Sequence, residues 1–131
     1  MKTRFYTIDE IKKLKNNFFI DDIKHKRELV YNPVFKLWTI MMKLEFPEFS
    51  AREIFTRAGI DVNILNRNLP HRRIKEWFDN YKQFGVGYFI SDSNYYHTIN
   101  KVAEEPVELC KFKTQLLSYI LKRLRFHEKN R

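Results

Sequence analysis

The stretch RRIKEWFDNYKQFG, residues 72–85, carries the most regular helical pattern of the chain and decides how the rest is interpreted. Its apolar side chains recur every three or four residues. They are Ile74, Trp77, Phe78, Tyr81 and Phe84. This spacing predicts an amphipathic helix that begins at Pro70 and ends at Gly85. Because basic side chains surround the apolar ones, the stretch predicts either a helix that contacts DNA or a well-packed helix of a small basic protein.

Length and charge set the limits of the interpretation. The 131 residues suffice for one domain with its own core. Lys and Arg number 25 against 16 Asp and Glu, a formal net charge of +9, and positive charge gathers in residues 1–30, 67–85 and 109–131. A basic protein gains affinity for nucleic acid because each neutralised phosphate releases counterions. The plainer alternative is that the charge only keeps the protein soluble.

No pattern typical of an enzyme is visible. Cys110 is the single cysteine, which excludes an internal disulfide and a Cys-x-x-Cys zinc site. The four histidines lie far apart in the sequence and none belongs to a His-Glu-x-x-His motif. The longest apolar run, LWTIMM, is too short to span a membrane, and the N-terminus has no signal-like segment. We therefore expect a cytoplasmic protein without catalytic activity, cofactor, metal site or membrane contact.

Local signals predict helices along most of the chain, and the three glycines argue against a protein rich in sheet turns. Thr7 caps a short first helix. Asn32 and Pro33 begin a helix over residues 33–45, which Pro47 prevents from continuing. Ser50 and Glu53 form a capping box for a third helix, which ends at Gly59. Residues 18–31 fit neither the helical nor the strand period, and they stay unassigned between a linker, a short strand and a half-turn of helix.

A long amphipathic helix is expected to follow Pro106. Its apolar stripe consists of Leu109, Phe112, Leu116, Leu117, Ile120, Leu121 and Leu124. Three interpretations stay open for this helix: it packs back on the domain, it forms a homodimer, or its basic residues lie near a second DNA segment.

The central region resembles the homeodomain-like helix-turn-helix domains of bacterial insertion-sequence proteins. The matching features are the FK opening, the SAREIF..AG helix and the basic, Trp-containing RRIKEWFDNYKQFG ending, over residues 34–85. The resemblance implies an all-α fold whose third helix enters the DNA major groove. Within that helix, WFDN is similar to the Trp-Phe-x-Asn of eukaryotic homeodomains, which implies that Asn80 contacts adenine. The chain departs from the family by the ten residues that lie between Gly59 and Pro70 in the sequence, which we interpret as an inserted helical turn.

These observations lead to a specific expectation. The chain is expected to be all-α, with an N-terminal arm carrying a short helix (1–31), a helix-turn-helix core (32–86), and a loop and C-terminal helix (87–131). Its expected function is binding of double-stranded DNA, as a transposition-associated or regulatory protein. The residues expected to contact DNA are His71, Arg72, Arg73, Lys75, Asn80 and Lys82 of the third helix, with Ser50 and Arg52.

A second function keeps the fold but changes the partner. In this alternative the protein is an interaction module of a phage or mobile element. It would bind a protein partner through its last helix or an aromatic surface made of Tyr88, Phe89, Tyr95 and Tyr96. The salt dependence of binding distinguishes the two functions, because affinity for phosphates falls steeply with salt whereas affinity at an aromatic interface does not.

Overall fold

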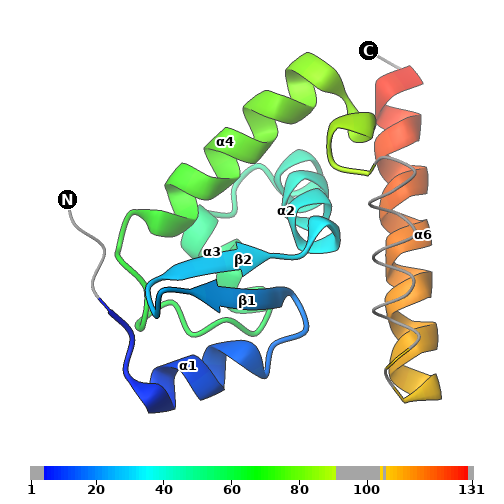
Figure 1. The fold of residues 1–131 in the computed structure, drawn as a ribbon. Coiled ribbons are helices and arrows are strands. Elements are labelled where there is room, and N and C mark those ends of the chain that lie inside the picture. The colour runs from blue at the N-terminus through cyan, green and yellow to red at the C-terminus, as the bar shows by residue number, and fades with distance from the viewer. Residues whose placement is uncertain (1–4, 91–103, 105, 130–131) are drawn as a thin grey trace. The chain divides into compact units, whose positions relative to one another are not determined.

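The computed structural model describes residues 5–90, 104 and 106–129 (Figure 1). The chain divides into two compact units, residues 1–77 and 78–131. The helices and strands, in chain order, are α1 (Ile8–Lys15), β1 (Ile20–Lys24), β2 (Glu28–Tyr31), α2 (Pro33–Glu45), α3 (Ala51–Arg57), α4 (Leu69–Phe84), the 3-10 helix η1 (Val86–Tyr88) and α6 (Val107–Lys129). The boundary between the units falls within α4, so each unit is described by itself.

The expected all-α fold is wrong, because β1 and β2 pair as an antiparallel hairpin before α2. The hairpin occupies the segment that the sequence left unassigned. A register shift between Ile20 and Asp22 places Asp21 as an extra residue in β1, which breaks the alternation that would reveal a strand. The turn then uses His25 and Lys26, whereas Asn and Gly are the usual signals of a hairpin turn. Both local signals of a hairpin are therefore hidden.

The predicted helix starts are confirmed where a cap is visible in the sequence. Thr7 and Glu10 form a reciprocal capping box at α1, with hydrogen bonds of 3.2 and 2.9 Å. The Asn32 side chain accepts from the Val34 amide at 2.8 Å, and α2 covers the predicted residues 33–45. At α3 the Ser50 hydroxyl accepts from the Glu53 amide at 3.1 Å.

An aromatic cluster joins the elements of the first unit. Trp77 of α4 is 2% exposed, and its ring lies 5.8 Å from Phe35 of α2 and 5.0 Å from Tyr31 of β2. Phe55 of α3 completes the cluster at 5.1 Å from Phe35. Phe19, just before β1, lies 5.0 Å from Phe35, so the segment expected to be an arm contributes to the core. Trp77 is thus a core residue, as its helical spacing indicates.

The link between α3 and α4 consists of hydrogen-bonded turns instead of the inserted helical turn that we expected. Gly59 has a φ of 83°, which allows the chain to leave α3. The Asp61 carboxylate accepts from the Asn63 amide at 3.0 Å, and the Asp61 carbonyl accepts from Ile64 at 3.2 Å. Ile64 and Leu65 are buried, so the link is anchored in the core of the first unit.

The second unit contains the end of α4, η1 and α6. The hydroxyl of buried Tyr81 donates to the Leu124 carbonyl at 3.3 Å and lies 3.1 Å from His127 Nδ1. The Glu128 carboxylate accepts from the Val86 amide at 2.7 Å. These contacts hold the last turns of α6 against the end of α4. Within the second unit, the C-terminal helix therefore packs back on the element that precedes it.

Candidate nucleic-acid interface

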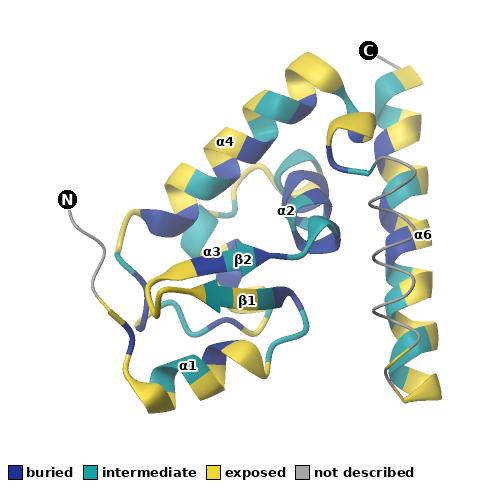
Figure 2. Cartoon of the chain, viewed as in Figure 1, coloured by how far each residue is buried: buried dark blue, intermediate teal, exposed yellow. Residues whose placement is uncertain are grey.

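The N-terminal half of α4 divides into a buried side and an exposed basic side (Figure 2). Ile74 and Trp77 are buried in the first unit. His71, Arg72 and Lys75 are exposed. A helix that buries its aromatic side while presenting cations to solvent has the form of a helix that docks in a DNA groove.

Arg73 is held closer to the core than its neighbours. Its guanidinium Nη1 lies 3.4 Å from the Glu76 carboxylate, and the residue is half-buried. Burial raises the pKa of the Tyr31 hydroxyl, and the nearby positive charge of Arg73 acts in the opposite direction. The Tyr31 hydroxyl is buried near the Arg73 guanidinium, although the two groups do not form a hydrogen bond of good geometry. Arg73 therefore stabilises the junction of β2 and α4, and only part of its charge faces solvent.

Lys36 of α2 lies in the same region, although its position gave no signal in the sequence. Its ammonium nitrogen is 5.8 Å from the centre of the Trp77 ring. Burial lowers the pKa of Lys36, an effect that the neighbouring Glu76 carboxylate opposes and Arg73 reinforces. Half-buried Lys36 and Arg73 thus form a charged cluster with exposed Glu76 beside the aromatic core.

Asn80 and Lys82 follow Trp77 along α4 and belong to the second unit. Asn80 is half-buried. The Lys82 ammonium lies 3.6 Å from the Asp79 carboxylate and 5.3 Å from the centre of the Phe78 ring. The structure does not bring these two residues together with Arg72 and Lys75 in one compact unit.

The two residues expected to contact the DNA backbone from α3 have different surroundings. The Ser50 hydroxyl is engaged as the cap of α3. Arg52 lines an open hollow of about 420 Å³ together with Val62, Asn63, Leu65 and Arg67. Two arginine residues in the lining of one hollow make it a candidate position for an anion such as a phosphate. Arg67, which the sequence interpretation did not single out, is therefore a further candidate for a backbone contact.

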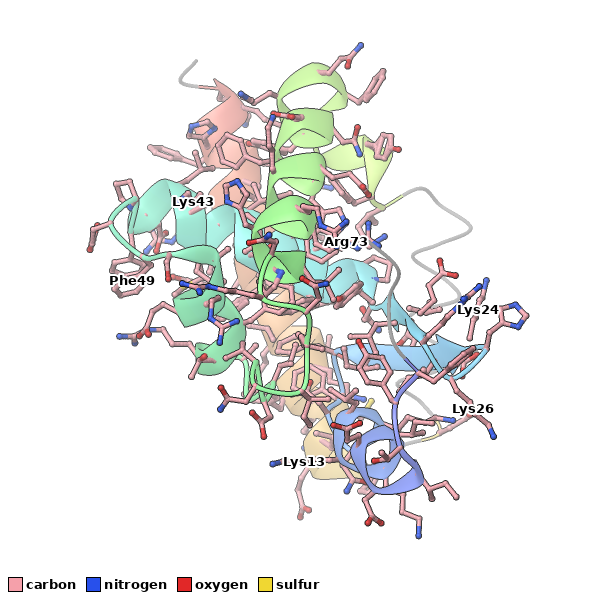
Figure 3. The ribbon with its side chains drawn as sticks, turned by 90° about the vertical axis from the view of Figure 1, so that its left-hand side faces the viewer. Lys13, Lys24, Lys26, Lys43, Phe49 and Arg73 are labelled. Atoms are coloured by element: carbon pink, nitrogen blue, oxygen red, sulfur yellow. The ribbon has the colours of Figure 1, made fainter. Side chains whose placement is uncertain are left out.

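The hairpin tip carries cations that the sequence interpretation missed. Lys24, His25, Lys26 and Arg27 are consecutive and exposed. In Figure 3, Lys24 and Lys26 project from the end of the hairpin at the right of the view, below and to one side of α4, which carries Arg73. The basic run KHKR can be seen in the sequence, but that its residues form the end of a hairpin could not be predicted from it. The tip and the start of α4 together give the first unit a basic face.

Other cations of the first unit form ion pairs, and the neighbouring carboxylates partly neutralise them. The Lys13 ammonium lies 2.7 Å from the Asp61 carboxylate, and Arg57 Nε lies 3.0 Å from the Glu53 carboxylate. In Figure 3, Lys13 marks α1 below the hairpin. Lys13 and Arg57 are therefore weaker candidates for phosphate contacts than the exposed cations of the hairpin tip.

Comparison with family models, with curated proteins and with solved structures gives no match. Within the described ranges, none of the helices combines the length and apolar character that crossing a membrane requires. In the same part of the chain, His, Cys, Asp and Glu side chains form no group of three that suits a metal ion.

Proposed function

We propose that the protein binds double-stranded DNA through the basic face of its first unit, as a non-catalytic transposition-associated or regulatory protein. The observation that carries this proposal is the division of α4, which buries Trp77 and exposes Arg72 and Lys75. The hairpin tip adds cations on the same face. The resemblance of residues 34–85 to helix-turn-helix domains points to the same helix.

The dimensions of α4 suit the DNA major groove. Its 16 residues span about 24 Å at a rise of 1.5 Å per residue. The major groove of B-DNA, about 12 Å wide, admits a helix. Arg72 and Lys75 would then neutralise phosphates or pair with guanine, and a bidentate base contact contributes about 1–3 kcal/mol of discrimination. By the resemblance, Asn80 is the candidate adenine contact.

The test measures binding of the full chain to a fluorescent random 30-base-pair duplex across salt concentrations. We expect Arg72→Gln with Lys75→Gln to lower the salt slope by about 2, at about 0.9 per phosphate contact, and to weaken binding about 30-fold at 0.15 M salt. The matched control is Lys12→Gln with Lys122→Gln, which removes the same charge from exposed positions on α1 and α6. Equal weakening by both variants would show that net charge and not α4 determines binding, and would refute the proposal.

Exposed aromatic side chains in the second unit favour the alternative of a protein partner. Phe84 is 56% exposed and Tyr88 49% exposed, with their rings stacked at 5.1 Å. Phe89 is buried, and Tyr95 and Tyr96 lie outside the described residues. Of the residues expected to form the aromatic surface, Tyr88 is thus the one that the described part of the chain exposes.

α6 adds a second aromatic feature. Exposed aromatic side chains recur every seven residues along it, at Phe112, Tyr119 and Phe126. This repeat suits a partner helix or a homodimer.

Sedimentation of the wild type and of a variant with Phe84→Ser and Tyr88→Ser tests whether the exposed aromatic side chains bind a protein partner. Salt-insensitive association that the variant loses would support it, and a wild-type monomer that captures no partner would oppose it.

A further inference from the structure

The β1–β2 turn concentrates positive charge at one narrow point. Arg27 donates its amide to the Lys24 carbonyl at 3.1 Å, which closes the turn around His25 and Lys26. All four side chains are exposed. Acidic residues lie behind them, with Asp22 on β1 and Glu28 on β2. The positive charge of the hairpin is therefore concentrated at its turn and does not continue along the strands.

The tip is built from residues that the backbone geometry disfavours. His25 and Lys26 have φ values of 53° and 58°, in the left-handed region that glycine and asparagine occupy most readily. Two successive residues with side chains in this region carry conformational strain, which is typical of functional positions. Glycine and asparagine would make a more stable turn but would remove the charge. The turn therefore carries charged side chains at positions where glycine or asparagine would be more stable.

Residues before α1 hold the tip in place. The Tyr6 amide donates to the Lys26 carbonyl at 2.7 Å, and Tyr6 is buried. The Arg27 guanidinium lies 5.4 Å from the centre of the Phe5 ring. A tip that is braced before it meets its ligand loses less conformational entropy on binding than a mobile loop.

We propose that the hairpin tip inserts into the DNA minor groove next to the major groove that α4 occupies. This inference rests on the proposed function and adds a second contact to it. A hairpin laid lengthwise in a major groove would bring Asp21 and Asp22 of β1 towards phosphates, whereas insertion by the tip keeps Asp22 two residues further from the DNA than Lys24, and only Glu28, which faces Lys24 across the hairpin, stays near the groove. The minor groove is about 6 Å wide, and its narrow A·T-rich stretches attract Lys, Arg and His through their strong negative potential. The tip should therefore favour A·T-rich duplexes.

The experiment compares the full-length protein with two charge-matched variants on A·T-rich and G·C-rich duplexes. The tip variant is Lys24→Gln with Lys26→Gln, and the control is Lys12→Gln on α1 with Lys122→Gln on α6, two exposed positions outside the hairpin. Circular dichroism checks that both fold. Each duplex is titrated across salt concentrations, alone and with netropsin, a small molecule that fills the A·T minor groove.

We expect the tip variant to bind the A·T-rich duplex about 30-fold more weakly at 0.15 M salt, from the loss of two contacts at about 0.9 in slope each. It should also lose the A·T preference and the sensitivity to netropsin, while the control retains both. Binding by the tip variant equal to that of the control, with the Arg72 and Lys75 variant still weakened, would overturn the tip contact and leave the proposed function standing.

Two other results would also overturn the inference. Weaker binding by the tip variant with an unchanged A·T preference and unchanged netropsin sensitivity would rule out the minor groove as the site of the contact. Absence of salt-dependent binding by the wild type would remove the proposed function, and the tip contact with it.

Discussion

Replacement of Lys26 by glycine should make the first unit more stable and its binding to DNA weaker. Lys26 has a φ of 58°, and a left-handed conformation costs a residue with a side chain about 1–2 kcal/mol. Glycine avoids this cost, but its freedom in the unfolded chain costs about 0.5–1 kcal/mol. The net expectation is a gain of about 0.5–1 kcal/mol in the free energy of unfolding. Loss of one phosphate contact should weaken DNA binding about 5-fold at 0.15 M salt.

The matched control is Lys26→Ala, which removes the same charge but keeps a side chain in the strained conformation. Urea unfolding followed by tryptophan fluorescence reports on the first unit, because both tryptophans, Trp38 and Trp77, lie within residues 1–77. We expect Lys26→Gly to be more stable than Lys26→Ala, and both to bind DNA equally weakly. Equal stability of the two variants would refute the account of a strained turn. Binding as tight as that of wild type would refute its role in DNA contact.

Three further predictions follow from single contacts. Tyr31→Phe should change the free energy of unfolding at pH 7 by less than about 1 kcal/mol, because the buried hydroxyl makes no hydrogen bond of good geometry and has the Arg73 guanidinium as a polar neighbour. Burial raises the pKa of Tyr31 above 10.0, so wild-type stability should fall above pH 10 as the unfolded chain ionises, and unfolding of Tyr31→Phe should show less of this fall. Gly85→Ala should destabilise the second unit by about 1–2 kcal/mol, since φ is 75° and the new methyl group would lie 3.0 Å from the Glu128 carboxylate; unchanged amide hydrogen exchange in α6 would contradict this. Ser50→Ala should lower the free energy of unfolding by about 1 kcal/mol through loss of the α3 cap, with an unchanged salt slope because the hydroxyl is uncharged; a changed slope would argue against this.

The sequence predicts the helices well because their signals are local. Asn32 and Pro33 mark the start of α2, and Thr7 with Glu10 marks that of α1, as the structure confirms. The hairpin could not be predicted in the same way. The extra residue in β1 breaks the strand period, and the turn uses His25 and Lys26 where the usual signal is glycine or asparagine.

The candidate site is partly predictable for the same reason. Exposure of Arg72 and Lys75 follows from the helical period, which places them away from Trp77. The position of Arg73 beside Tyr31 depends on a contact between β2 and α4, and no local pattern encodes it. Asn80 belongs to the second unit and Arg72 to the first, and the amphipathic pattern of a continuous helix does not reveal this boundary.

Protection of lysines from acetylation locates bound DNA most directly. The full chain is acetylated briefly with and without a 30-base-pair duplex, at low and high salt, and each lysine is quantified by mass spectrometry. The account predicts that DNA protects Lys24 and Lys26 at the hairpin tip and Lys75 on α4, that high salt abolishes this protection, and that Lys12 on α1 reacts equally throughout. Protection confined to the lysines of α6, or no protection at any salt concentration, would contradict the assignment of DNA binding to the basic face of the first unit.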